Sequence, residues 1–406
     1  MKIIVQKFGG TSVATPESRA AVVKKVKEAK QNGYAPVVVV SAMGRKGQPY
    51  ATDTLISVLK EANAKPAAHE MDLLMACGEI ISSAVMAATL QANDINAKAL
   101  TGGQAGMITD NNFGEAKIKS IKTGYLISLL EEGIVPVICG FQGETEDDFA
   151  ITTLGRGGSD TSAAAFGAAL KADLVEIYTD VEGIMTADPR IVGEAKIMKQ
   201  ISYGEICEMA HQGAKVIHPR AVEIAMHNNT PLVVKSTFSD APGTLISAAT
   251  NSAVMEDDGS NTAHVASGVA HLTGISLFGI KLDGSDAKNG KTLFDTLAKH
   301  GISIGSMSLQ PHSTMFAVYT PAAEKTMEVL KQQGYEYGYE ADCAKVSVIG
   351  TGMGGVPGVM ATFVAALANA NIQILQTTDS ITTISAIIKE KDVKQAVVAL
   401  HSDFNL

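Results

Sequence analysis

Four consecutive valines, Val37 to Val40, constrain the fold of this chain more than any other short segment. The run is β-branched and unalternating, which is typical of a strand buried on both faces of a parallel sheet. The valine run lies in a strand predicted at 36–41. Further apolar strands are predicted at 3–7, 135–139, 174–178 and 231–235, and helices at 18–31, 53–62, 70–92 and 115–132. This alternation predicts an α/β domain over residues 1–246, a mainly parallel sheet between layers of helices.

The chain changes character after residue 246. Residues 247–263 are small and polar with an acidic cluster, which predicts a surface linker. A set of apolar residues beyond it recurs at an offset of 70 residues: Leu297, Ala298, Ile302 and Ile304 match Leu367, Ala368, Ile372 and Ile374. We therefore expect two α+β units of the βαββαβ kind, at 264–340 and 343–406. The second ends on a helix, so residues 264–270 are expected to supply its missing strand.

Composition narrows the class of protein. The 406 residues suit two or three domains. The 33 basic residues against 42 acidic ones give a net charge of −9, which argues against a nucleic-acid binder. No apolar run approaches the roughly 18–20 residues of a membrane helix, and the N-terminus does not resemble a signal peptide. The four cysteines follow no metal or disulfide spacing. A cytoplasmic protein with no membrane partner is expected.

The first candidate for chemistry directly follows the first strand and reads Lys7-Phe8-Gly9-Gly10-Thr11-Ser12. Two glycines allow the backbone to approach a phosphate closely, and successive N–H groups form an anion nest. Lys7 adds a point charge for a phosphoryl oxygen. The alternative is a capped Gly-Gly turn beside a surface lysine.

The second candidate is Gly155-Arg156-Gly157-Gly158-Ser159-Asp160, which opens a helix of small residues. A glycine-preceded helix N-terminus is an anion site, and Arg156 can bind a carboxylate through two hydrogen bonds. Asp160 is placed to orient a lysine or a metal-bound water. The alternative is a capped helix with a glycine hinge.

Other segments are less decisive by themselves. The stretch 179–190 follows a strand and suits ribose and base contacts, or else forms a proline-terminated turn. Glu79 and Lys215 each lie in an apolar stretch of sequence. Each is either a charge on a helix surface or an inward-facing group that binds a ligand. His218 is expected to be structural or capping. Residues 350–355 match GxGxxG, but only about 50 residues follow, too few for a dinucleotide-binding fold.

The motifs together carry a resemblance that covers essentially the whole chain. KFGGTS, VSAMG at 40–44, CGE at 77–79, GRGGSDTSA, YTDVEGIMTADPR and KVIHPRA at 215–221 occur in this order. The set closely resembles the aspartate kinases of the amino-acid kinase family, and the tail resembles their tandem ACT regulatory domains. Short monofunctional bacterial enzymes, including the diaminopimelate-sensitive type, are the most similar.

The resemblance implies a fold, a reaction and a set of site residues. The expected fold is the amino-acid kinase fold followed by two ACT units. The expected reaction transfers phosphate from ATP to the side-chain carboxylate of L-aspartate, the first step of lysine, diaminopimelate, threonine and methionine biosynthesis. The implied catalytic residues are Lys7, Asp160 and Lys215. The implied ATP contacts are Lys7, Phe8, Gly9, Gly10, Ser41, Ser159, Thr179, Asp180, Met185, Thr186, Ala187, Asp188, Pro189, Arg190 and Lys215. The implied aspartate contacts are Thr52, Glu79, Arg156, Gly157, Gly158 and Ser159.

Cofactor, effector and partners follow from the same resemblance. Mg²⁺ is expected to bind mainly through the ATP phosphates, with Asp160 as an outer partner and no protein-built metal site. Lysine, diaminopimelate or threonine is the expected feedback effector, read by Asp283, Gln376 or Asp379. A homodimer or larger oligomer is expected to form through the ACT units. The alternatives are a kinase acting on acetylglutamate or glutamate, and a non-catalytic amino-acid sensor.

Overall fold

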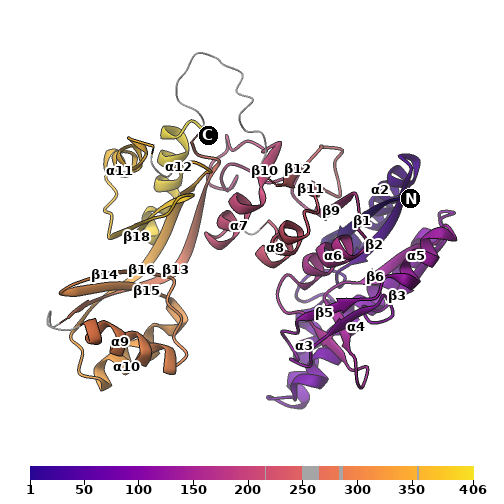
Figure 1. Ribbon diagram of the computed structural model, residues 1–406, viewed down its shortest axis with the longest axis horizontal. Coiled ribbons are helices and arrows are strands. Elements are labelled where there is room, and N and C mark those ends of the chain that lie inside the picture. The colour runs from indigo at the N-terminus through magenta and orange to yellow at the C-terminus, as the bar shows by residue number, and fades with distance from the viewer. Residues whose placement is uncertain (215, 249–264, 283–286, 354–355) are drawn as a thin grey trace. The chain divides into compact units, whose positions relative to one another are not determined.

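The structure, a computed structural model, describes residues 1–214, 216–248, 265–282, 287–353 and 356–406. The chain forms two compact units (Figure 1). The first comprises Met1–Ile184, Ile197–Ala210 and Lys215–Val254, and the second Met185–Lys196, His211–Ala214 and Met255–Leu406. Two short segments that precede residue 246 therefore pack with the second unit. The expected linker lies almost entirely outside the described residues.

An eight-stranded sheet forms the centre of the first unit, in the order β10-β12-β11-β9-β1-β2-β6-β3. Its strands are β1 (Lys2–Phe8), β2 (Tyr34–Val40), β3 (Ala97–Leu100), β6 (Val135–Cys139), β9 (Leu174–Thr179), β10 (Gln200–Ser202), β11 (Leu232–Ser236) and β12 (Thr244–Ser247). Neighbouring strands are parallel except for the antiparallel pair β11 and β12. Val37 to Val40 lie on β2 and are fully buried, so the largely parallel sheet predicted from them is confirmed.

Helices cover this sheet. They are α1 (Gly10–Val13), α2 (Pro16–Gln31), α3 (Thr52–Ala62), α4 (Ala68–Gln91), α5 (Gly124–Glu131), α6 (Gly158–Ala169), α7 (Tyr203–His211) and α8 (Pro219–His227). Phe8 packs in one core with residues of α2 and α4, while Lys7 pairs with Asp160 of α6. Because successive side chains of a strand point to opposite faces, α2 and α4 lie against one face of β1 and α6 against the other.

One predicted helix is wrong in part. The segment expected to be helical over 115–132 contains β5 (Ile118–Ile121) before α5 begins at Gly124. β5 belongs to a four-stranded sheet, in the order β5-β4-β7-β8, with β4 (Met107–Thr109), β7 (Gln142–Thr145) and β8 (Ile151–Thr153). Ile118 and Ile121 have helical spacing, but backbone pairing with β4 decides the conformation.

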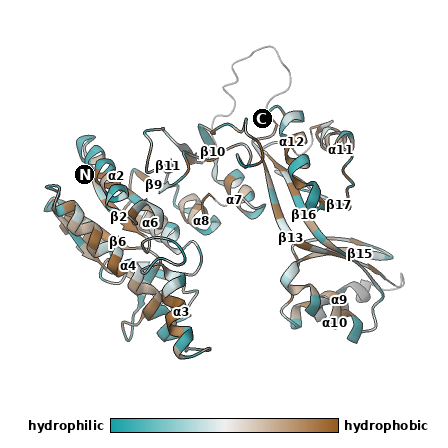
Figure 2. Cartoon of the chain, turned by 180° about the vertical axis from the view of Figure 1, so that it is seen from behind, coloured by the Kyte–Doolittle hydropathy of each residue, from teal (hydrophilic) through white to brown (hydrophobic). Residues whose placement is uncertain are grey.

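Helix α4 is long and apolar enough to cross a membrane by length and composition. In this fold it is a core helix, and its buried residues Met86, Ala87 and Leu90 belong to the same core as α2 and β2. Four polar residues on it are also buried: Asp72, Glu79, Ser82 and Ser83. Figure 2 shows hydrophobic residues on the strands and on α4. Of these four, Glu79 lines the candidate site, whereas Asp72 lies outside it.

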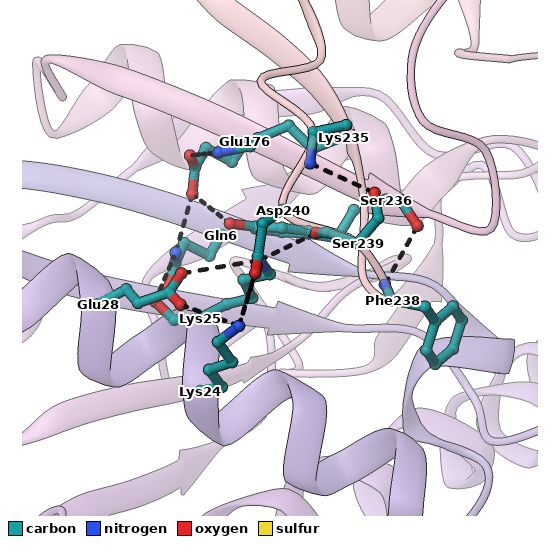
Figure 3. Close-up of polar contacts among 12 residues, drawn as sticks. Gln6, Lys24, Lys25, Glu28, Glu176, Lys235, Ser236, Phe238, Ser239 and Asp240 are labelled. Carbon is teal, nitrogen blue, oxygen red and sulfur yellow. Dashed lines mark hydrogen bonds and ion pairs between the residues drawn. The ribbon is translucent and has the colours of Figure 1, made fainter.

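A polar network on the α2 face ties α2 to the loop after β11 (Figure 3). Glu176 on β9 accepts hydrogen bonds from Gln6 Nε2 at 2.8 Å and Lys235 Nζ at 3.2 Å. The Lys25 ammonium donates to Asp240 Oδ1 at 2.7 Å. The hydrogen bond between Gln6 and Glu176 therefore holds β1 beside β9 at the residue that precedes Lys7.

The second unit contains one six-stranded antiparallel sheet, in the order β14-β15-β13-β16-β18-β17. Its strands are β13 (Gly268–Lys281), β14 (Ser306–Gln310), β15 (Ser313–Tyr319), β16 (Tyr337–Ile349), β17 (Gln376–Asp379) and β18 (Thr383–Lys389). Its helices are α9 (Ala287–Lys299), α10 (Ala323–Gln332), α11 (Val359–Asn369) and α12 (Val393–Asp403), with short 3₁₀ turns η1 (Thr320–Ala322) and η2 (Glu390–Asp392).

The two repeats share this sheet. The first part of β13, 268–272, pairs with 345–349 of β16, so the prediction that a preceding segment completes the second repeat is confirmed, with the strand starting at Gly268. β16 runs without interruption through the expected boundary between 340 and 343. The neighbours of β16 are antiparallel, which differs from the parallel sheet that a GxGxxG turn serves in dinucleotide-binding folds.

Segment 185–196 packs within the second unit. Ala187 and Val192 are buried in the core that α11 and α12 form with the sheet. Thr186 Oγ1 lies 2.9 Å from His401 Nε2, and the Thr186 carbonyl accepts a hydrogen bond from Val269 N. The part of the predicted nucleotide-binding segment that starts at Met185 therefore belongs to the second unit.

Candidate active site

A pocket of about 330 Å³ lies at the carboxyl ends of β1 and β2 and the N-terminus of α6. In parallel sheets this edge is where ligands bind. Ten of the predicted site residues line it: Lys7, Gly10, Ser41, Thr52, Glu79, Arg156, Gly157, Gly158, Ser159 and Asp160. Segments far apart in sequence thus bring the phosphate motif and the carboxylate motif to one cavity.

Lys7 and Asp160 form the charged centre of one wall. Lys7 Nζ lies 2.6 Å from Asp160 Oδ1, and both side chains are largely buried. The ion pair holds the lysine ammonium at the end of β1, at the N-terminus of α6. A cation fixed in this way needs little reorganisation to meet a phosphoryl group.

Gly10 shows why the phosphate motif needs glycine. A Cβ at this position would lie 2.7 Å from the Ala42 carbonyl oxygen and 2.8 Å from that of Gly44. The backbone at Gly10 thus lies close to the backbone of residues 42–44, and Gly44 N donates to the Gly10 carbonyl at 3.0 Å. The loop after β2 is therefore joined to the loop after β1.

Glu79 is an inward-facing acid, so the interpretation of it as a surface charge is wrong. Its side chain is 3% exposed, and Oε1 accepts a hydrogen bond from Ala42 N at 3.0 Å. Among the described residues Oε2 has no hydrogen-bond partner. Burial raises the pKa of Glu79 to about 8, with the Ala42 N–H acting in the opposite direction. A buried acid with an unused oxygen suits a cationic ligand.

The resemblance to aspartate kinases assigns Glu79 to the α-ammonium of aspartate, and on that assignment we expect aspartate use to rise with pH. At pH 7 a group with a pKa of about 8 is mostly protonated, whereas an ammonium ligand prefers the ionised form. Raising the pH from 6 to 8 should therefore increase kcat/KM for aspartate by about tenfold per pH unit, with a plateau above the pKa. Steady-state kinetics at fixed saturating ATP measure this. A flat profile in the wild type, or an unchanged rise in Glu79→Gln, would contradict the assignment.

Arg156 stands on a loop whose glycines are conformationally required. Gly155 has φ +75° and Gly157 has φ +69°, both in the left-handed region. A Cβ at Gly157 would lie 2.1 Å from Cγ of His218. Among the described residues, no hydrogen bond or ion pair holds the exposed Arg156 guanidinium. The cation is therefore available to a ligand in the pocket.

His218 has the structural role that the sequence predicts. It is the N-cap of α8, and its Nδ1 accepts from Arg220 N at 3.4 Å.

Several predicted nucleotide contacts do not line the pocket. The Phe8 ring is fully buried and stacks on Tyr178 at 4.7 Å, so only its backbone can face a ligand. Gly9 N donates to the Tyr178 carbonyl. Thr179 ends β9, and Asp180 follows it. Residues Met185 to Arg190 belong to the second unit, and Lys215 lies outside the described residues.

Eight of the lining residues are not among the predicted ligand contacts: Ala42, Gly44, Arg45, Lys46, Ala51, Asp53, Phe141 and Gly155. Arg45 Nη2 lies 2.7 Å from Asp180 Oδ2, which joins the loop after β2 to the end of β9. Phe141 has φ +70°, an uncommon conformation for this residue type, and its N–H donates to Ser162 Oγ. The Arg45-Lys46 pair directly follows VSAMG, so its two positive charges could have been predicted to lie at the site. Nothing in the sequence indicates the positive φ of Phe141.

Known proteins share this architecture. The amino acid kinase family model matches residues 2–236, and an ACT domain model matches residues 338–402. Aspartokinase 1 of Bacillus subtilis is 45% identical over 406 residues, all of both chains, and the aspartokinase of Geobacillus stearothermophilus is 40% identical over all of this chain and 98% of its own. The structure of E. coli aspartokinase III in complex with aspartate and ADP matches with a TM-score of 0.80 and 26% identity, covering 100% of both chains. The chain belongs to the aspartokinases of the amino acid kinase family.

Proposed function

We propose that this aspartokinase transfers the γ-phosphoryl group of ATP to the side-chain carboxylate of L-aspartate in the pocket described above, giving ADP and 4-phospho-L-aspartate. One observation carries the assignment to this pocket: Lys7 and Asp160 occupy one wall, while Glu79 and Arg156 line the same cavity. Aspartate offers an ammonium for Glu79 and an α-carboxylate for Arg156. Its remaining carboxylate can then face Lys7.

The chemistry needs positioning and charge neutralisation more than a base. An aspartate side chain has an ordinary pKa near 4, so the nucleophile is already ionised at pH 7. Lys7 and the backbone around Gly10 would stabilise the transferring phosphoryl group, and Ser159 and Asp160 would lie between the two substrates. Each of these residues lines the pocket. The protein therefore supplies fixed charges and orientation.

The nucleotide would extend from this pocket toward the end of β9. Ser41 and Gly10 line the pocket, and Thr179 and Asp180 are the proposed contacts beyond it. We also assign Lys215 and the run Met185 to Arg190 to the nucleotide, as the family motif implies. The Asp188 carboxylate is bound by its neighbour Arg190 at 2.7 Å, and this pair lowers the pKa of Asp188.

Mg²⁺ would be held mainly by ATP oxygens and water, with Asp160 as an outer partner. Asp160 lines the pocket beside Lys7, which suits a group that orients metal-bound water. Among the described residues no group of three or more histidine, cysteine, aspartate or glutamate side chains could hold an ion. When bound, the ion would neutralise phosphate charge during transfer.

A hydroxylamine-trapping assay tests the proposed reaction. Acyl phosphates form coloured hydroxamates, so the protein is incubated with ATP, Mg²⁺, hydroxylamine and either L-aspartate, L-glutamate or N-acetylglutamate. We expect colour with aspartate alone. Equal colour with glutamate or acetylglutamate would contradict the proposal that aspartate is the specific substrate. No colour with any of the three would favour a non-catalytic sensor.

We also propose that the second unit binds an amino-acid effector, with lysine, diaminopimelate and threonine as candidates. A solved structure of E. coli aspartokinase III in complex with lysine and aspartate, in a T-state, matches this chain with a TM-score of 0.76 and 26% identity, covering 99% of both chains. Of the three proposed contacts here, Asp283 lies outside the described residues, Asp379 is exposed, and Gln376 is 7% exposed. Neither amide atom of Gln376 has a hydrogen-bond partner within the described part of the chain.

Sheet register places Gln376 beside a cavity. Gln376 pairs with Ile387, and Ile387 pairs with Lys345, so the three side chains share one face of the sheet. Ile387 and Lys345 line a cavity of about 240 Å³ that Ser306 also lines. Ser306 Oγ is buried without a partner among the described residues. This face thus offers unused polar groups to a small ligand.

We expect Gln376→Leu to weaken feedback inhibition. An effector inhibits only if it binds the inactive arrangement more tightly, and typical coupling of 1–3 kcal/mol is a factor of about 5–150. The concentration for half-inhibition should rise by a factor in that range, while activity without effector stays unchanged. The exposed Gln332→Leu serves as the matched control. Unaltered inhibition by all three amino acids in Gln376→Leu would contradict the role.

A homodimer joined through the second unit is the proposed assembly. β14 and β17 are the edges of its sheet, and Met307 and Leu309 are exposed on β14. Exposed apolar edge strands are ready to pair with another chain. We place the enzyme in the cytoplasm, at the first step of the biosynthesis of lysine, diaminopimelate, threonine and methionine.

A further inference from the structure

A fully buried carboxylate, Asp72, lies outside the pocket and is used by none of the roles above. It is 0% exposed and lies on α4, two helical turns before Glu79. Its Oδ2 accepts hydrogen bonds from Thr153 N at 2.7 Å and Gly114 N at 2.9 Å, and its Oδ1 accepts from Thr153 Oγ1 at 2.8 Å. One side chain therefore joins α4, the end of β8 and the loop that contains Gly114.

A second charged group, Arg220 of α8, holds the same two segments. Its Nη1 donates to the Leu154 carbonyl at 2.9 Å, and its Nη2 donates to the Ala116 carbonyl at 3.1 Å. Ala116 N in turn donates to the Thr153 carbonyl at 2.9 Å. The strand end 153–154 is thus fixed by an acid on its N–H side and a cation on its C=O side.

The loop that carries Arg156 begins at this strand end. Leu154 N donates to the Phe141 carbonyl, and a Cβ on Gly155 would lie 3.2 Å from the Gly114 carbonyl oxygen. Gly157 lies against the ring of His218. Because the Arg156 guanidinium itself has no hydrogen bond or ion pair among the described residues, the backbone on either side decides where it can reach.

We propose that Asp72 and Arg220 are positioning residues that hold the 154–157 backbone so that Arg156 meets the α-carboxylate of the substrate. This rests on the proposed binding of aspartate in the pocket. α4 then serves the substrate twice, through Glu79 directly and through Asp72 by way of the Arg156 loop. Neither Asp72 nor Arg220 lines the pocket, so neither touches the substrate.

The variants separate hydrogen bonding from charge. Asp72→Asn keeps a full set of bonds, because its carbonyl oxygen can accept both N–H groups while its amide donates to Thr153 Oγ1. Asp72→Ala leaves two backbone N–H groups without an acceptor in a buried place. Arg220→Met removes the two carbonyl contacts but keeps most of the side-chain length. Glu70→Ala removes a half-exposed acid from the same helix and is the control.

Kinetics of the full-length enzyme test the proposal, after circular dichroism has shown that each variant is folded at the assay temperature. Asp72→Ala and Arg220→Met should each raise KM for aspartate about tenfold, with KM for ATP and kcat within about twofold. Asp72→Asn should recover most of the loss. An unchanged KM for aspartate in both variants, or an equal rise in KM for ATP, would overturn the proposal.

A double-mutant cycle gives a readout that a merely structural role would not move. In the Arg156→Met background, Asp72→Ala should change kcat/KM for aspartate by less than about twofold, because the cation that it positions is gone. Independent factors that multiply would overturn the proposal. If Arg156→Met itself leaves aspartate use intact, or the wild type forms no aspartyl hydroxamate, the proposed function has failed instead. Should Asp72→Ala not fold, the same cycle is run with Arg220→Met.

Discussion

Replacing Lys7 with alanine is expected to lower kcat by about 100-fold or more while the fold stays intact. Charge develops on the phosphoryl oxygens during transfer, and a cation that is already fixed stabilises that charge more than it stabilises bound ATP. Lys7 is such a cation, because Asp160 holds its ammonium at 2.6 Å on the wall of the pocket. The loss should therefore appear in kcat more than in KM for ATP.

Steady-state rates at saturating ATP and aspartate measure the effect. Lys2→Ala is the matched control, since it removes the same charge from an exposed position on the same strand. A Lys7→Ala enzyme with near-normal kcat would reduce the KFGGTS segment to a structural turn.

The sequence predicted the parts of the fold that local pattern determines. The valine run identified β2 as a buried strand, and the 70-residue repeat predicted the order of elements in both copies. β5 was missed because Ile118 and Ile121 have helical spacing, while the pairing with β4 that decides their conformation is not local. The packing of 185–196 with the second unit was missed for the same reason, since burial of Ala187 and Val192 depends on residues that come about 75 to 210 positions later.

The site residues also divide into those that sequence motifs predict and those whose environment only the fold decides. The motifs named Lys7, Arg156 and Asp160, and the structure places all three on one pocket. For Glu79 the residues alone left two interpretations open, and burial on α4 decided for the inward one. Asp72 differs from Glu79 by one methylene and lies on the same helix, yet it contacts backbone instead of the cavity. No spacing rule separates an acid that faces a cavity from one that binds backbone.

Substitutions of Glu79 and Arg156 should each lower kcat/KM for aspartate by about 30–1,000-fold, because bound substrate would desolvate each charge pair, and removing one partner of such a pair costs about 2–4 kcal/mol. Both groups are prepared for a ligand. Within the described part of the chain, Glu79 Oε2 is buried without a hydrogen-bond partner, and the Arg156 guanidinium makes no hydrogen bond or ion pair. KM for ATP should change little, because the proposed phosphate contacts lie around Lys7.

Substrate analogues assign each group to its partner. Succinate lacks the ammonium of aspartate, and 3-aminopropanoate lacks the α-carboxylate. Glu79→Gln should lose the preference for aspartate over succinate but keep the preference over 3-aminopropanoate, and Arg156→Met should show the reverse pattern. Glu70→Gln, a substitution of the half-exposed acid on α4, should keep both preferences. If either site variant lost both preferences equally, or raised KM for ATP as much as KM for aspartate, the two residues would not read separate groups of the substrate.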